Sequence, residues 1–331
     1  MQVLPLALFL VLLELTAGSF ISLFLLDVRG DSSRGFIVFQ GVLYALVALL
    51  TVGAMNAFAT PQIVHGYGLD EPWLAGQGPL TLALLLLMVP WNVLLWLDRS
   101  TPRGKGAQQA RTLRAALAEP PLRLARFAVG ALTSLVALAD LFVVGMAYRA
   151  LAESRLDGAL VVLAFVAGAL ALGGVMTAML LGHWYLNTPT ASGKPLEFVT
   201  TLTLVALALE MAFLIFVGPA TVHATVATTQ IAPGTVIHTT GSGVVISSPT
   251  PGANGQTPES TARQTPIATT AMVWLEFILG FLAPLALAAV ALYLTRGRSF
   301  QSATGMLYLC VSFIFLGEIL ARGLLLFPIF G

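Results

Sequence analysis

Residues 158–187 read GALVVLAFVAGALALGGVMTAMLLGHWYLN, a stretch without a single aspartate, glutamate, lysine or arginine. A helix needs about 20 consecutive apolar residues to cross the hydrocarbon core of a bilayer. Only helices and closed barrels can cross it, because every backbone polar group must find its partner within the protein. The stretch therefore predicts a transmembrane helix, longer than the minimum, that tilts or protrudes from the bilayer.

Similar apolar runs recur along the whole 331-residue chain, which is 57% hydrophobic and 9% charged. A soluble domain carries about 25% charged residues, so this composition excludes one. We expect an all-α fold, a polytopic transmembrane bundle of eight helices. The predicted spans are 3–26, 36–58, 79–97, 127–149, 158–187, 199–219, 271–295 and 303–328. The first lacks the basic start and the cleavage site of a signal peptide, and is expected to be retained.

Lysine and arginine are distributed unevenly between the two sets of loops. The loop after the third span holds Arg99, Arg103, Lys105, Arg111, Arg114, Arg123 and Arg126, and loops on the same side add Arg29, Arg34, Lys194, Arg296 and Arg298. Loops on the other side hold Arg149, Arg155 and Arg263. Because short cytoplasmic loops carry the excess of basic residues, both termini are predicted to lie outside. The location is then the inner (cytoplasmic) membrane, with the lipid bilayer as the main surrounding.

Three regions follow from this pattern. Residues 1–219 form the first six helices and include a basic cytoplasmic loop at 98–126, which lies on the inner membrane surface or is solvated. Residues 220–270 form a Thr-, Ser- and Pro-rich extracytoplasmic loop, in which 235–237 and 244–246 are expected to pair as a small hairpin. Residues 271–331 form the last two helices.

Ionisable residues inside the spans are the candidate functional residues, since each costs about 2.5–3.5 kcal/mol to place in a bilayer. They are Glu14, Asp140, Glu210, Glu276, Glu318 and Arg322. The carboxyl groups suit a proton path that opens to the outside, and they equally suit neutral acids that hydrogen bond neighbouring helices. The spacing of four residues places Glu318 and Arg322 on one helix face. That pair is either a structural clamp or part of a site for an oxygen-rich ligand.

His183 lies near the cytoplasmic end of the fifth span, beside Trp184 and Tyr185. It is either the edge of a quinone site or an interfacial polar residue. No second histidine lies within an apolar span, and Cys310 is the single cysteine, so we expect no haem and no iron–sulfur cluster in this chain. No metal site and no nucleic-acid partner are expected. Gly174, Ala178 and Gly182, spaced by four, predict a face for close helix packing.

Three segments resemble a known family. They are Glu14 followed by Gly18, Tyr148-Arg149, and the run Leu316-Gly-Glu-Ile-Leu-Ala-Arg322. These segments and the overall plan are similar to the membrane anchor subunits of dimethyl sulfoxide reductase and, more distantly, of polysulfide reductase. Those subunits are eight-helix, quinol-interacting proteins without a haem of their own. The resemblance implies a subunit that binds menaquinone or ubiquinone as the quinol and passes electrons to an iron–sulfur partner, in a complex with a catalytic subunit.

Two other classes remain open. The intramembrane carboxyl groups and the helix discontinuity expected at Pro284 favour a proton-coupled membrane transporter. A non-catalytic scaffold subunit of a membrane complex is the third hypothesis.

Overall fold

The computed structural model describes residues 3–57, 63–64, 67–97, 121–149, 155–188, 191–217, 236–240, 243–247 and 274–326. Eight helices in these ranges are long and apolar enough to cross a membrane, which confirms the predicted all-α, polytopic bundle. In chain order they are α1 (Val3–Arg29), α2 (Arg34–Ala57), α3 (Glu71–Leu97), α5 (Pro121–Tyr148), α6 (Arg155–Asn187), α7 (Lys194–Val217), a combined helix of η2 (Phe277–Leu282) and α9 (Ala283–Arg296), and α10 (Phe300–Leu326).

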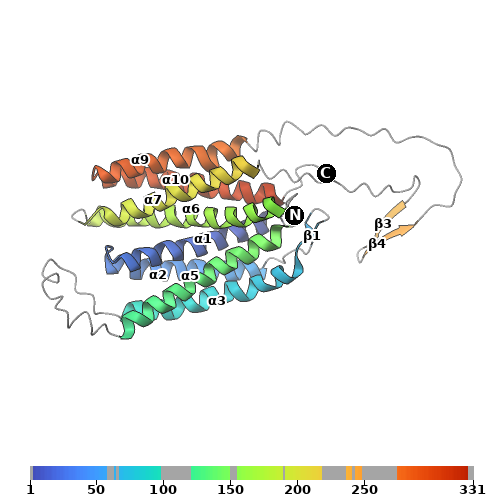
Figure 1. Cartoon of the computed structure of the whole chain (residues 1–331), viewed down its shortest axis with the longest axis horizontal. Helices are drawn as coiled ribbons and strands as arrows, with labels where there is room; N and C mark the ends of the chain where they lie inside the picture. Colours follow the sequence, from blue (N-terminus) through green and yellow to red (C-terminus); the bar gives the residue numbers. More distant parts are fainter. Residues whose placement is uncertain are drawn as a thin grey trace.

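The helices lie side by side along one direction, and α1 occupies the middle of the bundle (Figure 1). This helix contacts α2, α5, α6, α7 and α10. In its most apolar window, 78% of the residues are buried inside the protein, more than in any other span. Polar side chains on α1 therefore face other helices rather than lipid.

Helix α3 differs from the predicted span 79–97, because it begins at Glu71. Pro72 stands in the first turn, where a missing N–H costs nothing, and Glu71 suits the positive end of the helix dipole. Pro79 and Pro90 both lie inside the helix, which membrane helices tolerate when other groups replace the lost backbone bonds. The Asn92 amide donates to Met88 O at 2.8 Å and to Gly41 O at 3.1 Å, tying α3 to α2.

The seventh span contains the discontinuity expected near Pro284. Residues Phe277–Leu282 form the π-helical segment η2, and Pro284 stands at the start of α9 directly after it. A π-helical turn inserts one extra residue into the ladder and is frequent at functional sites. Glu276 immediately precedes this segment.

The two predicted loops lie largely outside the described residues. The end of the basic loop differs from the prediction, because helix α5 begins at Pro121 and so includes Arg123 and Arg126. In the second loop, β3 (Val236–Thr240) pairs antiparallel with β4 (Gly243–Ser247), which confirms the hairpin. A shorter pair, β1 (Ile63–Val64) and β2 (Tyr67–Gly68), precedes α3.

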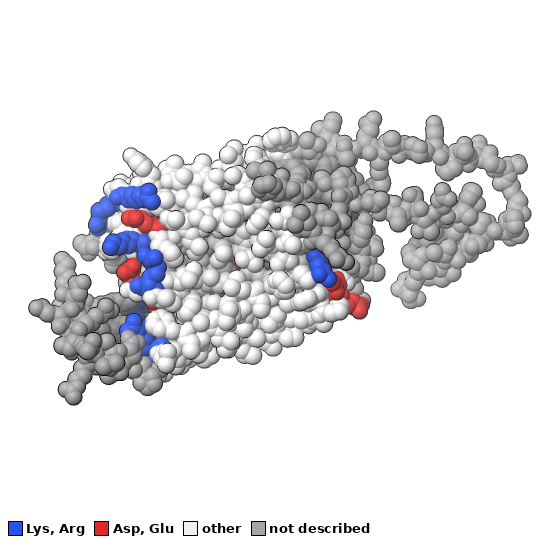
Figure 2. Space-filling model, in the orientation of Figure 1, with Lys and Arg blue, Asp and Glu red and all other residues white. Residues whose placement is uncertain are grey.

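Charged side chains gather at one end of the bundle, which we call the basic end (Figure 2). Helices α1, α3, α6 and α9 end there, and its described lysine and arginine residues are Arg29, Arg34, Arg123, Arg126, Lys194, Arg296 and Arg298. At the other end, where α1 begins and α10 ends, Arg149 pairs with Asp70 at 2.8 Å. The described charges thus follow the asymmetry seen in the sequence.

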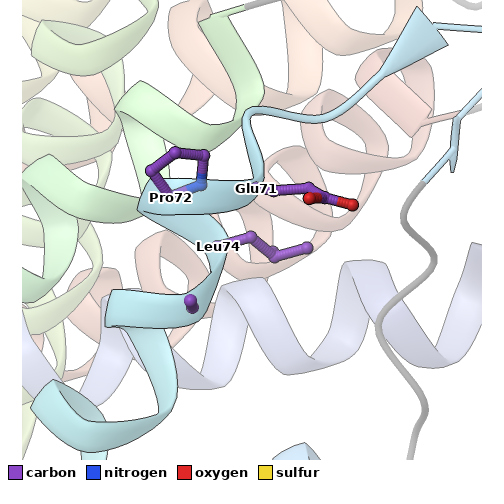
Figure 3. Close-up of a pocket in the computed structure, with 4 residues that line it drawn as sticks. Glu71, Pro72 and Leu74 are labelled. Carbon is purple, nitrogen blue, oxygen red and sulfur yellow. The ribbon is translucent and has the colours of Figure 1, made fainter.

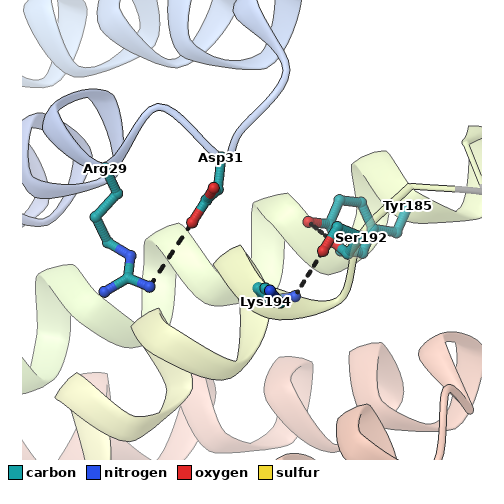
Figure 4. Close-up of polar contacts among 5 residues, drawn as sticks. All are labelled: Arg29, Asp31, Tyr185, Ser192 and Lys194. Atoms are coloured by element: carbon teal, nitrogen blue, oxygen red, sulfur yellow. Dashed lines mark hydrogen bonds and ion pairs between the residues drawn. The ribbon is translucent and has the colours of Figure 1, made fainter. Parts of the chain in front are cut away.

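Short polar contacts hold the connections at the basic end (Figure 4). Arg29 lies 3.7 Å from Asp31 just after α1. The Tyr185 hydroxyl donates to Ser192 O at 2.7 Å, and the Lys194 backbone N–H contacts Ser192 Oγ at 3.4 Å. The two contacts of Ser192 fix the turn between α6 and α7.

Glycines allow the helices to approach closely. A Cβ placed on Gly18 of α1 would lie 1.7 Å from Ala169 O of α6, and one on Gly173 would lie 2.0 Å from the Gly18 carbonyl carbon. The predicted small-residue face of α6 also packs closely, because Gly174 contacts Thr203 of α7 and Gly182 contacts Thr304 of α10. Helix α6 is thus held against three neighbours by glycine contacts.

Candidate functional site: a buried glutamate–arginine cluster

Five of the seven predicted site residues meet inside the bundle. Glu14 comes from α1, Glu210 from α7, Glu276 from the turn before η2, and Glu318 and Arg322 from α10. We call these five residues the glutamate–arginine cluster. All are buried, with exposed fractions between 0% for Glu14 and 6% for Arg322.

Arg322 holds the centre of this cluster. Its Nη2 lies 2.5 Å from Glu14 Oε1 and 3.1 Å from Glu318 Oε2. Its guanidinium carbon also lies 4.1 Å from the ring centroid of Phe165 on α6. A guanidinium can bind carboxylates with its edge and an aromatic ring with its face at the same time. Arg322 therefore connects α1, α6 and α10.

The remaining carboxyl groups surround the same guanidinium. Glu14 and Glu210 both interact electrostatically with Glu318. Glu276 interacts electrostatically with Glu318 and Arg322. One guanidinium cannot neutralise four buried carboxylates, so the geometry favours a cluster that holds protons.

Gly168 of α6 allows these groups to pack directly against the helix backbone. A Cβ at this position would lie 2.6 Å from Glu318 Oε1, and 3.0 Å from both Arg322 Nη2 and Glu210 Oε1. Three buried polar atoms of the cluster, Glu14 Oε2, Glu318 Oε2 and Arg322 Nε, have no hydrogen-bond partner among the described residues. Buried polar atoms are normally hydrogen bonded. The cluster therefore has two carboxylate oxygens that can accept a further hydrogen bond and one N–H that can donate one.

Asp140 and His183 do not belong to this cluster. Asp140 is fully buried on α5, and neither of its carboxyl oxygens has a hydrogen-bond partner among the described residues. His183 lies near the basic end of α6 with an exposed side chain, and its Nδ1 is 3.2 Å from the Tyr308 hydroxyl. The structure thus separates the predicted residues into one group of five and two isolated positions.

Sequence analysis did not identify Phe165 or Gly168. Both lie in the uniformly apolar part of α6, where an aromatic residue or a glycine is ordinary in a membrane helix. Only the rotation of α6 relative to α1 and α10 shows that these two residues face the cluster.

Other candidate sites among the described residues are weaker. No group of three or more His, Cys, Asp or Glu side chains in those ranges could hold a metal ion. A shallow depression of about 500 Å³ lies at the first turn of α3, lined by Glu71, Pro72, Leu74 and Ala75 (Figure 3). None of these residues belongs to the cluster.

The fold and the cluster define a multi-pass α-helical membrane protein with a buried group of ionisable side chains contributed by four spans. No protein-family model, no curated protein and no solved structure matches the chain. Functional inference therefore rests on the geometry of the cluster and on its surroundings.

Proposed function

We propose that the chain is the quinol-binding membrane anchor subunit of a respiratory-type oxidoreductase complex. The observation that carries the proposal is the convergence of Glu14, Glu210, Glu276 and Glu318 on Arg322 inside the bundle. The resemblance to the anchor subunits of dimethyl sulfoxide reductase points the same way. In this proposal the protein spans the inner (cytoplasmic) membrane, with its basic end inside and both termini outside.

The cluster residues fit a quinol headgroup chemically. A bound quinol supplies two electrons and two protons when it is oxidised. The unpartnered oxygen of Glu14 can accept a hydrogen bond from a hydroxyl group, and the unpartnered Nε–H of Arg322 can donate one to an oxygen. In this proposal Glu210 and Glu318, whose Oε1 atoms both lie beside Gly168, accept the protons in their deprotonated forms. As the resemblance to the anchor subunits implies, the electrons then pass to a partner iron–sulfur subunit.

The substitution Glu210→Gln tests this proposal. It removes a proton acceptor but keeps the shape of the side chain, so the protein should fold and quinol-linked electron transfer should fall about 100-fold or more. The measurement is quinone content and quinol oxidation by the complex purified from native membranes. Asp140→Asn is the matched control, because it neutralises an equally buried carboxyl group outside the cluster and should leave the rate unchanged. A wild-type rate in Glu210→Gln would contradict the proposal.

The π-helical segment favours a second candidate, a proton-coupled transporter. Glu276 directly precedes η2, and interrupted helices next to ionisable residues are typical of substrate sites in transporters. The two candidates differ in what accompanies the purified protein. A quinol anchor should be isolated with quinone and an iron–sulfur partner, whereas a transporter should take up solute alone in liposomes with an imposed proton gradient. Partner subunits without bound quinone would favour a scaffold subunit.

Orientation can be tested separately by cysteine labelling. In a Cys310→Ala background, Lys105→Cys should react with a membrane-impermeant reagent only from the cytoplasmic side. Gly255→Cys should react only from the outside, because it lies in the other loop. Labelling of both positions from one side of intact cells would show that the proposed topology is wrong.

A further inference from the structure

A second set of buried polar side chains lies between the glutamate–arginine cluster and the basic end. On α1, Ser19 and Ser22 follow Glu14 toward Asp27, and both serines are fully buried. With a rise of about 1.5 Å per residue, Ser19 lies one and a half turns from Glu14, and Asp27 lies a similar distance beyond Ser22. The central helix therefore carries polar groups at intervals from the cluster to the basic end.

Helices α2 and α6 add polar groups at the level of Ser19. The Tyr44 hydroxyl of α2 lies 2.8 Å from Thr177 Oγ1 of α6. Thr177 uses its own proton to donate to Gly173 O, so Tyr44 is the donor in this pair and its oxygen is left as an acceptor. Gln40 and Ser19 lie near that oxygen, although neither forms a hydrogen bond with it.

Several of these side chains have unused hydrogen-bonding capacity. Ser19 Oγ, Ser22 Oγ and both amide atoms of Gln40 are buried without a hydrogen-bond partner among the described residues. Buried polar groups in this situation are normally satisfied by ordered water, and such a water makes about three hydrogen bonds. The unpartnered atoms of Gln40 and Ser19, together with the Tyr44 oxygen, can supply them.

Polar residues that only hold helices together differ from this group, because their hydrogen bonds are satisfied within the protein. Thr16 of α1 and Thr51 of α2 lie on the same pair of helices, with their hydroxyl oxygens 2.7 Å apart. One hydroxyl donates to the other, and the second donates to the backbone, either from Thr16 to Leu12 O at 2.8 Å or from Thr51 to Val47 O at 2.9 Å. These hydroxyls satisfy one another and the backbone without water. The Ser19–Gln40 group does not.

The polar side chains of α1 extend to the basic end of the bundle. Asp27, at the end of α1, lies 3.2 Å from Arg126 of α5. Asp27 is 9% exposed, so this ion pair stands at the boundary between the bundle interior and the basic end.

We propose that Ser19, Ser22, Gln40 and Tyr44 bind a chain of water molecules that connects the glutamate–arginine cluster with Asp27 and Arg126, and that this chain carries protons between the cluster and the basic end. Each transfer moves a proton along a hydrogen bond from one oxygen to the next, and no co-reactant is needed. The inference requires that the cluster holds protons. It does not require that quinol is the ligand.

Hydroxyl-radical footprinting of the whole protein in nanodiscs tests the water sites. Radicals formed from bound water modify the side chains that touch it, so Tyr44 should be labelled several times faster than Phe9 after correction for intrinsic reactivity. Phe9 is the matched control, because it is an equally buried aromatic residue in an apolar part of the bundle. Gln40→Leu should reduce the labelling of Tyr44 to the control rate. Equal labelling of Tyr44 and Phe9 in the wild type would overturn the proposal.

Infrared spectroscopy of the cluster tests the proton path. After transfer to D2O, protonated carboxyl groups exchange their proton for deuterium, and their C=O band shifts as they do so. The measurement is made in an Asp140→Asn background, so that the signal comes from the cluster. Gln40→Leu should slow this exchange about tenfold, the factor expected when one hydrogen bond along the path is lost. The double variant Thr16→Val/Thr51→Val, which alters only the satisfied pair, should exchange at the wild-type rate.

The outcomes separate this inference from the proposed function. Unchanged exchange in Gln40→Leu, or no protonated carboxyl band at all, would refute the path. Neither result depends on quinone content or on quinol oxidation, which test the proposed function by themselves.

Discussion

Replacing Arg322 with leucine should destabilise the protein by about 3–5 kcal/mol, the cost of removing one partner of a buried ion pair. Arg322 is the only positive charge in the cluster, and it contacts both Glu14 and Glu318. Without it, these carboxyl groups must take up protons or remain as unpaired charges. The measurement is thermal or denaturant unfolding of the purified protein in detergent, followed by helical circular dichroism.

Arg322→Lys is the matched control for this prediction. A lysine keeps the charge but is a point donor, so it cannot serve Glu14, Glu318 and the Phe165 ring with one planar group. Its stability should fall between those of the wild type and Arg322→Leu. Removing Glu318 together with Arg322 should recover only part of the loss, because Glu14 would still be buried without its partner. Wild-type stability of Arg322→Leu would show that the ion pairs contribute nothing.

The eight spans could be predicted because the bilayer fixes both the length and the polarity of a helix that crosses it. The start of α3 was missed for a local reason. Its first turns contain Pro72, Gly76, Gly78 and Pro79, residues that end helices in water and dilute an apolar pattern. Inside a membrane bundle the same turns remain helical.

The cluster was predictable in part. The pair Glu318–Arg322 follows from a spacing of four residues on one helix, and the structure contains it. The shorter contact, between Arg322 and Glu14, joins residues 308 positions apart. Hydropathy defines where each helix lies along the membrane normal, but it contains no information on which helices are neighbours or how each is rotated.

The same limit explains the two isolated residues. Asp140 and Glu210 are indistinguishable in the sequence, since each is one carboxyl group in an apolar span. Helix packing directs Glu210 toward α10 and Asp140 toward α3. The central position of α1 could not be predicted from hydropathy either, because all eight spans are strongly apolar. Only packing shows that Ser19 and Ser22 are buried, and that Ser19 lies near Tyr44, rather than facing lipid.

Gly18→Ala should have the second large effect, a loss of about 3 kcal/mol or more, at or above the upper end of the cost of overpacking a core. The added Cβ would lie 1.7 Å from the Ala169 carbonyl oxygen, and backbone atoms on both sides cannot rotate away. Helices α1 and α6 must therefore separate, although alanine is the better helix former.

Gly53→Ala and Gly305→Ala provide the controls for Gly18→Ala, because a Cβ at either position meets nothing within 4 Å. Both should leave stability unchanged or raise it by about 0.4–1 kcal/mol, through the reduced freedom of the unfolded chain. Unfolding in detergent again gives the comparison. Equal stability of Gly18→Ala and Gly53→Ala would contradict the close packing of α1 and α6.

Since Glu14 stands one turn from Gly18, separation of these helices should also move Glu14 away from Arg322. Gly18→Ala should therefore impair the cluster as well as the fold, whereas substitutions at the two open glycines should spare both.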